Sequence, residues 1–212
     1  MRVKFFPRIE HPEQIWRRDL AAWVGIVMAL PYHTRFDRTV TQEVKAWVDG
    51  GGRLLLLGFE LGDRHHRSNL NDLAELFGLR FNTDIVAPGP ALNSKPYDAA
   101  IDVEFRDPKH PLLSGLSSIR VWNAQSVSTE PGGTAVITLD RLGVSHLRDD
   151  TAHYDENGWQ TGGNQQFLTM PAPADRCLAA FAPVDLCGRG QVLAFGTWDL
   201  RTGSACATRT AS

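Results

Sequence analysis

The fold is decided by the stretch Leu54-Leu55-Leu56-Leu57-Gly58-Phe59-Glu60-Leu61-Gly62. Its four leucines predict a short strand covered on both faces, because a strand with one face in water would alternate apolar and polar residues. The glycines predict a sharp turn directly after this strand. We expect such a turn to lift its middle side chain, Glu60, above the edge of the sheet.

Amphipathic and apolar segments flank this strand. Residues 39–48 predict a helix from their apolar spacing, and the glycines at 50–52 end it. Residues 69–77 predict a second helix, and the apolar run at residues 23–30 predicts another strand covered on both faces. Strands and helices therefore alternate, which favours an α/β fold with right-handed crossovers and a mostly parallel sheet.

The second half of the chain is less regular and rich in loops. We interpret the polar residues 148–167 as one long loop. Nothing in the middle of the chain resembles a linker, so we expect one domain over residues 1–202 and a flexible tail over residues 203–212. Short apolar stretches predict strands at residues 101–105, 121–127, 134–139, 177–181 and 191–195.

Composition narrows the classes of partner. Of the 212 residues 42% are hydrophobic, and the formal net charge is -2, which is typical of a globular chain. The near-neutral balance argues against nucleic-acid and anionic-membrane partners, which require an excess of Lys and Arg. No apolar run approaches the ~20 residues of a membrane span. Three cysteines without CxxC spacing (Cys177, Cys187 and Cys206) fit free or buried thiols in a reducing, cytoplasmic compartment, and we expect Cys177 and Cys187 to serve packing.

Four motifs resemble the class I glutamine amidotransferase-like superfamily. Residues 58–62 match its glycine-x-nucleophile-x-glycine turn, with Glu60 where the enzymes carry cysteine. Residues 46–54, Ala-Trp-Val-Asp-Gly-Gly-Gly-Arg-Leu, resemble a passage of ThuA-like domains and of the amidotransferase-like domains of gliding-motility and intraflagellar-transport proteins. Residues 110–116, His-Pro-Leu-Leu-Ser-Gly-Leu, and residues 190–196, Gly-Gln-Val-Leu-Ala-Phe-Gly, are similar to a turn and to the final strand of those domains.

This resemblance, which covers most of residues 23–200, implies a flavodoxin-like sheet with helices on both faces. Ligands of such sheets bind outside the carboxyl ends of the strands. The chain is not expected to be a cysteine-dependent glutamine amidotransferase, because Glu60 cannot replace the thiolate in that reaction. The rim then supplies these ligand-binding candidates: Tyr32, His33, Thr34, Phe59, Glu60, Leu61, His65, Trp198 and Asp199.

Glu60 and His33 are the candidates for proton transfer if the chain is an enzyme. Glu60 is also a candidate metal ligand or hydrogen-bond acceptor, and its structural alternative is a carboxylate that stabilises the start of the next helix. The alternative for His33 is a loop histidine bonded to a backbone carbonyl.

Two further groups of residues have functional and structural interpretations. Asp63, His65 and His66 are weak candidates for a metal site, since adjacent histidines on a helix point in different directions and a solvated turn is more common. Trp198 and Asp199 suit a sugar ring, which stacks on indole while its hydroxyls form hydrogen bonds, although most tryptophans serve packing alone.

Three functions follow in order of preference. The first is a non-catalytic small-molecule-binding or regulatory module, part of a larger protein or assembly and needing no cofactor. The second is an enzyme that acts on a small polar, sugar-like substrate, with Glu60 and His33 or His65 as acid and base. The third is a protein-interaction platform, for which homo-oligomer formation stays open.

Overall fold

The computed structural model describes residues 20, 23–29, 35–88, 100–104, 110–140, 142–150, 153–154, 160–162, 165–197 and 200–201. The tail expected over residues 203–212 lies outside these residues. The described part is an α/β structure, as the alternation of strands and helices predicted. Within it, no helix has both the length and the apolar composition that a membrane span requires.

A seven-stranded sheet forms the centre, in the order β1-β2-β14-β13-β7-β3, with β8 paired to β13. Its strands are β1 (Gly25–Ala29), β2 (Arg53–Leu57), β3 (Leu79–Phe81), β7 (Val127–Thr129), β8 (Thr134–Thr138), β13 (Arg176–Phe181) and β14 (Gln191–Phe195). The pairs β1–β2 and β2–β14 are parallel, whereas β13 and β7 make antiparallel pairs with their neighbours. The mostly parallel sheet is therefore not confirmed, since only β1, β2 and β14 are parallel.

Short connections explain the antiparallel part. A parallel neighbour requires a crossover of about a dozen or more residues. The chain between Phe181 at the end of β13 and Gln191 at the start of β14 is shorter than that, and it turns through η4 (Val184–Leu186). β14 therefore runs back beside β13 and becomes parallel to β2 on its other side.

The leucine run of β2 divides between two hydrophobic clusters. Leu54 and Leu56 belong to the cluster that includes the helices, whereas Leu55 and Leu57 pack against the other cluster. This division follows from the strand itself, because successive side chains point to opposite faces of a sheet. Burial of Leu54 and Leu56 contributes about 1.5–3 kcal/mol each, and Leu55 and Leu57 are half-buried. The prediction of a strand covered on both faces is thus confirmed for β2.

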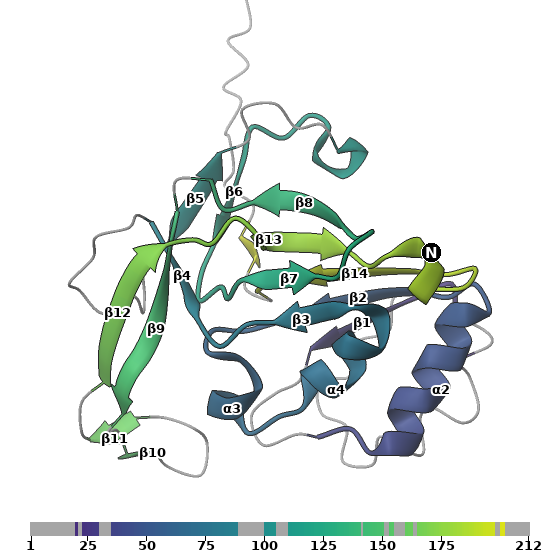
Figure 1. The fold of residues 1–212 in the computed structure, drawn as a ribbon, viewed down its shortest axis with the longest axis horizontal. Helices are drawn as coiled ribbons and strands as arrows, with labels where there is room; N and C mark the ends of the chain where they lie inside the picture. The colour runs from purple at the N-terminus through teal and green to yellow at the C-terminus, as the bar shows by residue number, and fades with distance from the viewer. Residues whose placement is uncertain are drawn as a thin grey trace, which may run out of the picture.

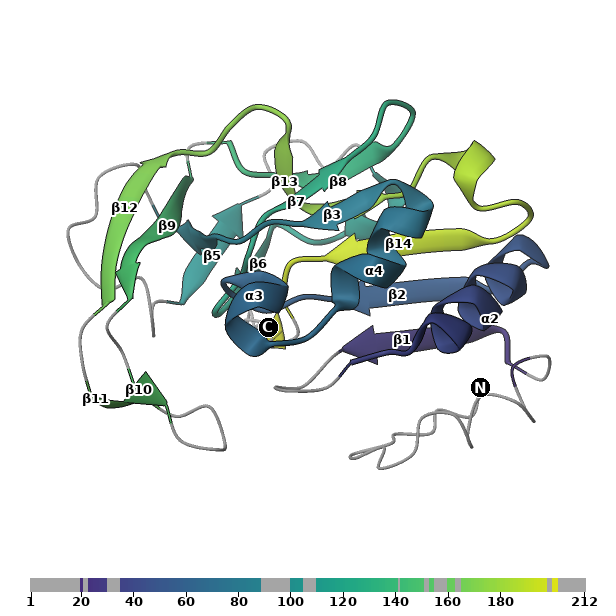
Figure 2. The same ribbon diagram turned by 60° about the horizontal axis from the view of Figure 1, so that its bottom comes forward.

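Helices cover one face of the sheet. α2 (Arg38–Asp49) buries Val40, Val44 and Val48, and α4 (Leu70–Ala74) with η2 (Glu75–Phe77) buries Leu73 and Phe77. These elements match the two helices that the sequence predicted. Figure 2 shows α2 and α4 in front of β2 and β14.

Strands cover the opposite face (Figure 1). β5 (Ile101–Glu104) and β6 (Ser118–Val121) supply Ile101, Val103 and Val121 to the second cluster, and β4 (Ile85–Ala87) supplies Val86. The alternating burial of β5 is typical of a strand with one face in water. Helices on both faces are therefore not confirmed, because in the described part of the chain this face carries strands.

Residues 148–167 were expected to form one long loop, and this prediction is wrong. β9 (Gly143–Asp150) and β12 (Gln165–Pro171) pair antiparallel within this region, and β10 (His153–Tyr154) pairs with β11 (Gln160–Gly162). These strands were not predicted because their sequences are polar and show little alternation of apolar and polar residues. Their pairing depends on backbone hydrogen bonds. β15 (Leu200–Arg201) pairs with β6, and η3 (Pro111–Leu113) precedes β6.

β1 was expected to be covered on both faces, and this is also wrong. Val24 is 77% exposed and Val27 is 62% exposed. Among the described residues β1 pairs with β2 alone, so it forms an end of the sheet. Only Met28 of this strand is buried.

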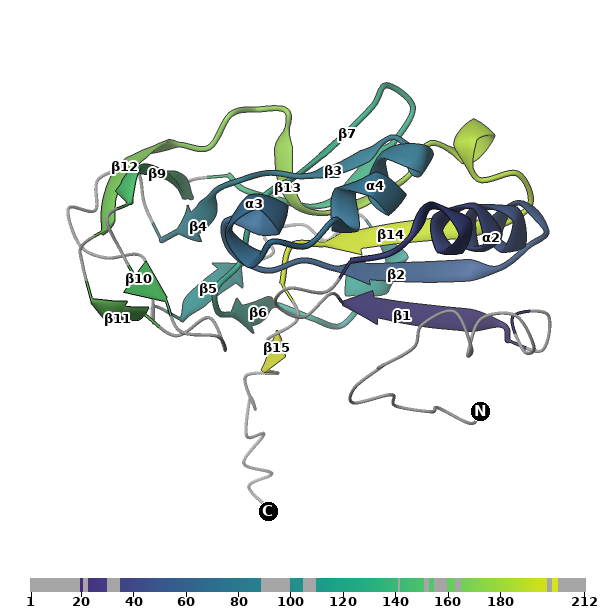
Figure 3. The same ribbon diagram turned by 90° about the horizontal axis from the view of Figure 1, so that it is seen from below.

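The register of β2 and β14 brings their carboxyl ends to one edge. Arg53 lies opposite Gln191, and Leu57 opposite Phe195. At the opposite end of the two strands, a hydrogen bond of 3.1 Å from Gln191 N–H to Gly52 O fixes this register. Figure 3 shows β1, β2 and β14 pointing the same way, toward α3 (Gly62–His66).

Candidate functional site

Three segments meet where β2 and β14 end. The first segment is the turn at residues 58–62, which we call the elbow. A hydrogen bond of 2.8 Å from Gly58 N–H to Phe195 O joins it to β14. At the centre of the elbow, a hydrogen bond of 3.0 Å from Glu60 N–H to Asn123 O joins it to the second segment, residues 122–126. That segment is tied to the end of β14, since Gln125 N–H donates to Gly196 O at 2.8 Å. Together these segments form the rim at which the sequence placed a site.

The elbow glycines are required by close packing. A Cβ atom at Gly58 would overlap the Gln125 amide nitrogen and lie 2.7 Å from the Phe81 ring. A Cβ atom at Gly62 would lie 2.9 Å from Gln125 Oε1, and this residue has a φ of +60°, which L side chains rarely adopt. The Gln125 amide therefore occupies the space beside both glycines.

The elbow encloses Glu60, whose side chain was expected to rise above the sheet edge. Glu60 is 5% exposed and Leu61 is also buried. The left-handed backbone lies at Leu61, with a φ of +59°, rather than at Glu60. The turn thus holds the carboxylate within the protein instead of presenting it to solvent.

His66 stabilises the elbow through a hydrogen bond to its backbone and through ring contacts. Its Nε2 lies 2.7 Å from Glu60 O, and because a carbonyl oxygen only accepts, Nε2 carries the proton. The ring packs edge-on against Phe59, with centroids 4.9 Å apart, and against the half-buried His65 at 5.2 Å. Burial lowers the pKa of His66 from 6.5 to about 4, so the imidazole is neutral at physiological pH.

Asp63 accepts hydrogen bonds from the start of the next helix, α4. Its carboxylate accepts hydrogen bonds of 2.7 Å from Ser68 Oγ and from the backbone N–H groups of Leu70 and Asn71. The carboxylate thus satisfies two backbone N–H donors at the start of α4. The described part of the chain holds no group of three or more His, Cys, Asp or Glu placed to bind a metal ion. Asp63, His65 and His66 are thus close in sequence without forming such a group.

The sequence did not identify the segment 122–126, which was assigned to a strand over residues 121–127. β6 ends at Val121 and β7 begins at Val127, so the residues between them leave the sheet pairing. Asn123 adopts a left-handed backbone with a φ of +47°. The polar run Asn-Ala-Gln-Ser within an apolar stretch was the available signal.

Asp84 connects the elbow to β13. Its backbone oxygen accepts from Leu61 N–H at 3.0 Å. Its fully buried carboxylate accepts from Ser126 N–H and Ser126 Oγ at 2.7 Å and from Arg176 Nη1 at 2.5 Å. This partly buried ion pair fixes the elbow relative to the antiparallel half of the sheet.

Several candidates lie elsewhere or outside the described residues. Tyr32, His33, Thr34, Trp198 and Asp199 are outside them. Thr197, which follows β14, is buried and donates from Oγ1 to Trp122 O at 2.8 Å. Cys177 and Cys187 are buried, which confirms their packing role; burial raises the pKa of Cys177 to about 12 and also raises that of Cys187.

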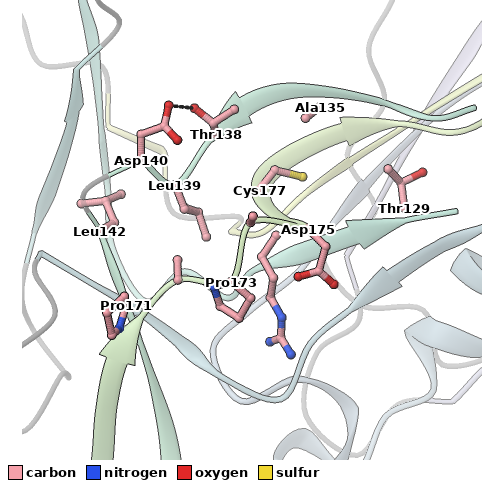
Figure 4. Close-up of a pocket in the computed structure, with 13 residues that line it drawn as sticks. Thr129, Ala135, Thr138, Leu139, Asp140, Leu142, Pro171, Pro173, Asp175 and Cys177 are labelled. Carbon is pink, nitrogen blue, oxygen red and sulfur yellow. Dashed lines mark hydrogen bonds between the residues drawn. The ribbon is translucent and has the colours of Figure 1, made fainter. Parts of the chain in front are cut away.

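Two surface hollows lie away from the elbow. One, of about 330 Å³, is lined by residues of β8, β13 and the chain before β13, including Leu139, Leu142, Pro171 and Pro173 (Figure 4). The other, of about 340 Å³, lies beside the start of α2. Neither includes an elbow residue.

Solved structures have a similar fold at low sequence identity. The mmIFT52 N-terminal domain is 19% identical with a TM-score of 0.54, and the match covers 84% of this chain and 67% of that chain. The cytoplasmic protein STM3548 from Salmonella typhimurium is 17% identical with a TM-score of 0.48, and the match covers 84% of this chain and 62% of that chain. No protein-family model and no curated protein matches the chain. The likeness to the mmIFT52 domain shows a shared fold.

Proposed function

We propose that this chain is a non-catalytic module that binds a small polar ligand at the rim formed by the elbow, the segment 122–126 and the end of β14. The observation that carries the proposal is the state of Glu60, which stands at the nucleophile position and is 5% exposed. With the backbone of Glu60 fixed by hydrogen bonds at its N–H and at its carbonyl oxygen, its carboxylate is the acceptor that we propose for the ligand. It cannot perform the thiolate chemistry of an amidotransferase.

The side chains around Glu60 support binding over catalysis. A general acid or base works best when its pKa lies near the operating pH. His66 has a pKa of about 4 because it is buried, and its Nε2 proton is committed to Glu60 O. Asp63 is committed to the backbone of α4. Neither group is placed to exchange protons with a substrate at neutral pH.

We further propose that the module belongs to the class I glutamine amidotransferase-like superfamily, in a flavodoxin-like variant whose second face is built from strands. The sequence motifs at residues 46–54, 58–62, 110–116 and 190–196 support that assignment, together with the fold shared with the mmIFT52 N-terminal domain. Since the match spans about two thirds of that chain, we propose that the module works within a larger protein or assembly. Two free buried thiols suit a cytoplasmic location.

An interaction platform is the second candidate, because β1 exposes apolar surface. Val24 and Val27 are largely exposed at an end of the sheet, where a strand can add to another chain. Light scattering after gel filtration of the wild type and Val27→Lys tests this candidate. A dimer that becomes a monomer in Val27→Lys supports it, and a wild-type monomer at all concentrations excludes self-association through β1.

Thermal-shift assays on the wild type and Glu60→Gln test the main proposal. The panel contains mono- and disaccharides, nucleotides and amino acids. A ligand that binds only the native state raises its stability by about 2.7 kcal/mol at a hundredfold excess over Kd. We expect a shift in the wild type that is lost in Glu60→Gln but kept in Glu104→Gln, a control at an exposed carboxylate on β5. A shift that survives Glu60→Gln places the site elsewhere.

A further inference from the structure

Three exposed arginines lie beside α3, toward which the carboxyl ends of β1, β2 and β14 point (Figure 3). Arg64 lies within α3, Arg67 ends this helix, and Arg35 precedes α2. None of the three forms an ion pair with a described residue. An exposed, unpaired guanidinium group at the edge where ligands of such sheets bind is available to an anionic ligand.

Backbone hydrogen bonds hold these arginines in one neighbourhood. The N–H of Arg67 closes the last turn of α3, so Arg67 stands three residues after Arg64, a spacing at which helical residues are neighbours. Two residues further on, the Asn69 amide binds the backbone of Phe36: Oδ1 accepts from its N–H at 2.7 Å and Nδ2 donates to its carbonyl oxygen at 2.9 Å. Arg35 precedes Phe36 and is therefore held beside the end of α3.

The carboxylates of this neighbourhood are engaged in hydrogen bonds within the protein. Asp63 accepts three, two of them from the backbone of α4. Asp37 accepts from Val40 N–H at 2.9 Å, and Asp72 accepts from Asn69 Nδ2 at 2.8 Å. Positive charge is thus presented by exposed arginine side chains, whereas each of these negative charges is bound to donors of the chain itself.

We propose that Arg35, Arg64 and Arg67 form an anion site, which we call the arginine patch, and that it binds a phosphate group of the ligand at the rim. A guanidinium group stays charged at every physiological pH and presents a planar set of donors that matches phosphate. Near pH 7 a phosphate monoester carries about 1.5–2 negative charges and three acceptor oxygens, enough for three guanidinium groups. A carboxylate offers one charge and two oxygens.

The arginine patch rests on the proposed function for the position of the ligand and adds the chemical class of that ligand. It is a phosphorylated small molecule that also carries hydroxyl or amino groups, one of which donates a hydrogen bond to Glu60. A patch of three arginines in a chain with a net charge of -2 suits a small anion better than a polyanion.

Isothermal titration calorimetry with inorganic pyrophosphate as the probe tests the arginine patch. We expect the wild type to bind pyrophosphate at low ionic strength, and more weakly at about 0.15 M KCl, where the Debye length is about 8 Å. Arg64→Gln and Arg67→Gln should each weaken binding about threefold, and the double variant about tenfold. The matched control is Arg53→Gln, which removes an exposed arginine at the opposite end of β2 and should bind as the wild type does.

Absence of pyrophosphate binding to the wild type at low ionic strength overturns the arginine patch. Equal weakening in Arg53→Gln and in the double variant overturns it too, because the attraction would then come from net charge alone. Tighter binding of citrate than of pyrophosphate overturns the assignment to phosphate.

Glu60→Gln separates the arginine patch from the proposed function. This variant keeps all three arginines and should bind pyrophosphate at least as well as the wild type does. Pyrophosphate binding through the arginines, with no ligand that depends on Glu60, overturns the proposed function alone. A polar ligand that depends on Glu60 but not on the arginines keeps the proposed function and overturns the arginine patch.

Discussion

The neutral state of His66 makes the stability of the protein depend on pH. Its pKa is about 4 in the folded chain, because burial disfavours the charged ring, against 6.5 for an exposed histidine. Between these values the unfolded chain binds a proton that the folded chain does not. The contribution of His66 to the free energy of unfolding is therefore fully present above pH 6.5 and is lost as the pH decreases toward 4.

The size of this loss follows from the two pKa values. A separation of about 2.5 units corresponds to about 3.4 kcal/mol when both states are fully titrated. At pH 5 the unfolded state is almost fully protonated at this position and the folded state is not, which gives a loss of about 2 kcal/mol relative to pH 7.5. Other groups titrate over the same range, so a variant is needed to isolate His66.

His66→Gln is the variant, because a glutamine amide can still donate to Glu60 O without taking up a proton. Urea unfolding at pH 7.5 and pH 5 measures the free energy of unfolding in each protein. We expect the wild type to lose about 2 kcal/mol more than His66→Gln between these pH values. His146→Gln on β9 is the control and should keep the wild-type loss, since it retains His66.

Equal losses in the wild type and His66→Gln, within about 0.5 kcal/mol, would refute this reasoning. They would mean that His66 is solvated enough to titrate in the folded chain. The imidazole could then act as a proton carrier at the rim, and the argument against catalysis would lose its main support.

Two further variants test how the elbow is held. Arg176→Met leaves the buried Asp84 carboxylate without its cation and should destabilise the chain by about 3–5 kcal/mol, with partial recovery in Asp84→Asn/Arg176→Met; a urea-unfolding change below about 1 kcal/mol would contradict the role of this ion pair. Gly58→Ala should cost about 1–3 kcal/mol through overlap with Gln125, whereas Gly25→Ala, whose nearest new contact is 3.4 Å, should cost much less. Equal melting temperatures for these two alanine variants would argue against close packing at the elbow.

The elements around β2 were predictable because local signals agree there. Four leucines, the glycines on each side of them and the apolar spacing of α2 all indicate a strand between two tight turns. The same agreement holds for β14, whose run from Gln191 to Phe195 lies where the sequence placed a strand. Close packing explains the glycines at both ends of these strands: side chains approach Gly52 and Gly58, and backbone oxygens approach Gly190 and Gly196.

Pairing direction and strand coverage were not predictable from the same signals. An apolar run such as residues 23–30 indicates a strand but not its neighbours, and β1 lies at an end of the sheet with Val27 exposed. β9 and β12 pair through their backbones, which leaves little trace in the side chains. The direction of β13 depends on a short connection, whose effect appears only once its partner is known.

The candidate site also combines residues that the sequence identified with residues that it did not. Glu60 was identifiable from the glycine pattern around it, whereas the sequence offered His66 only as a weak metal ligand and not as the partner of Glu60 O. The role of Gln125 required the fold, because 63 residues separate it from Gly62 while its amide packs against that glycine. Asp84 and Arg176 meet across an even longer separation. Long-range polar contacts have no local signature in a single sequence.

The central claim is that the rim binds a ligand without transforming it. The most direct measurement is proton NMR of the ligand that raises the melting temperature, incubated with the wild type and with Glu60→Gln. The account predicts that the ligand spectrum broadens or shifts through binding to the wild type and that no product resonance appears. Product formed by the wild type and lost in Glu60→Gln would contradict the account and make Glu60 a catalytic residue.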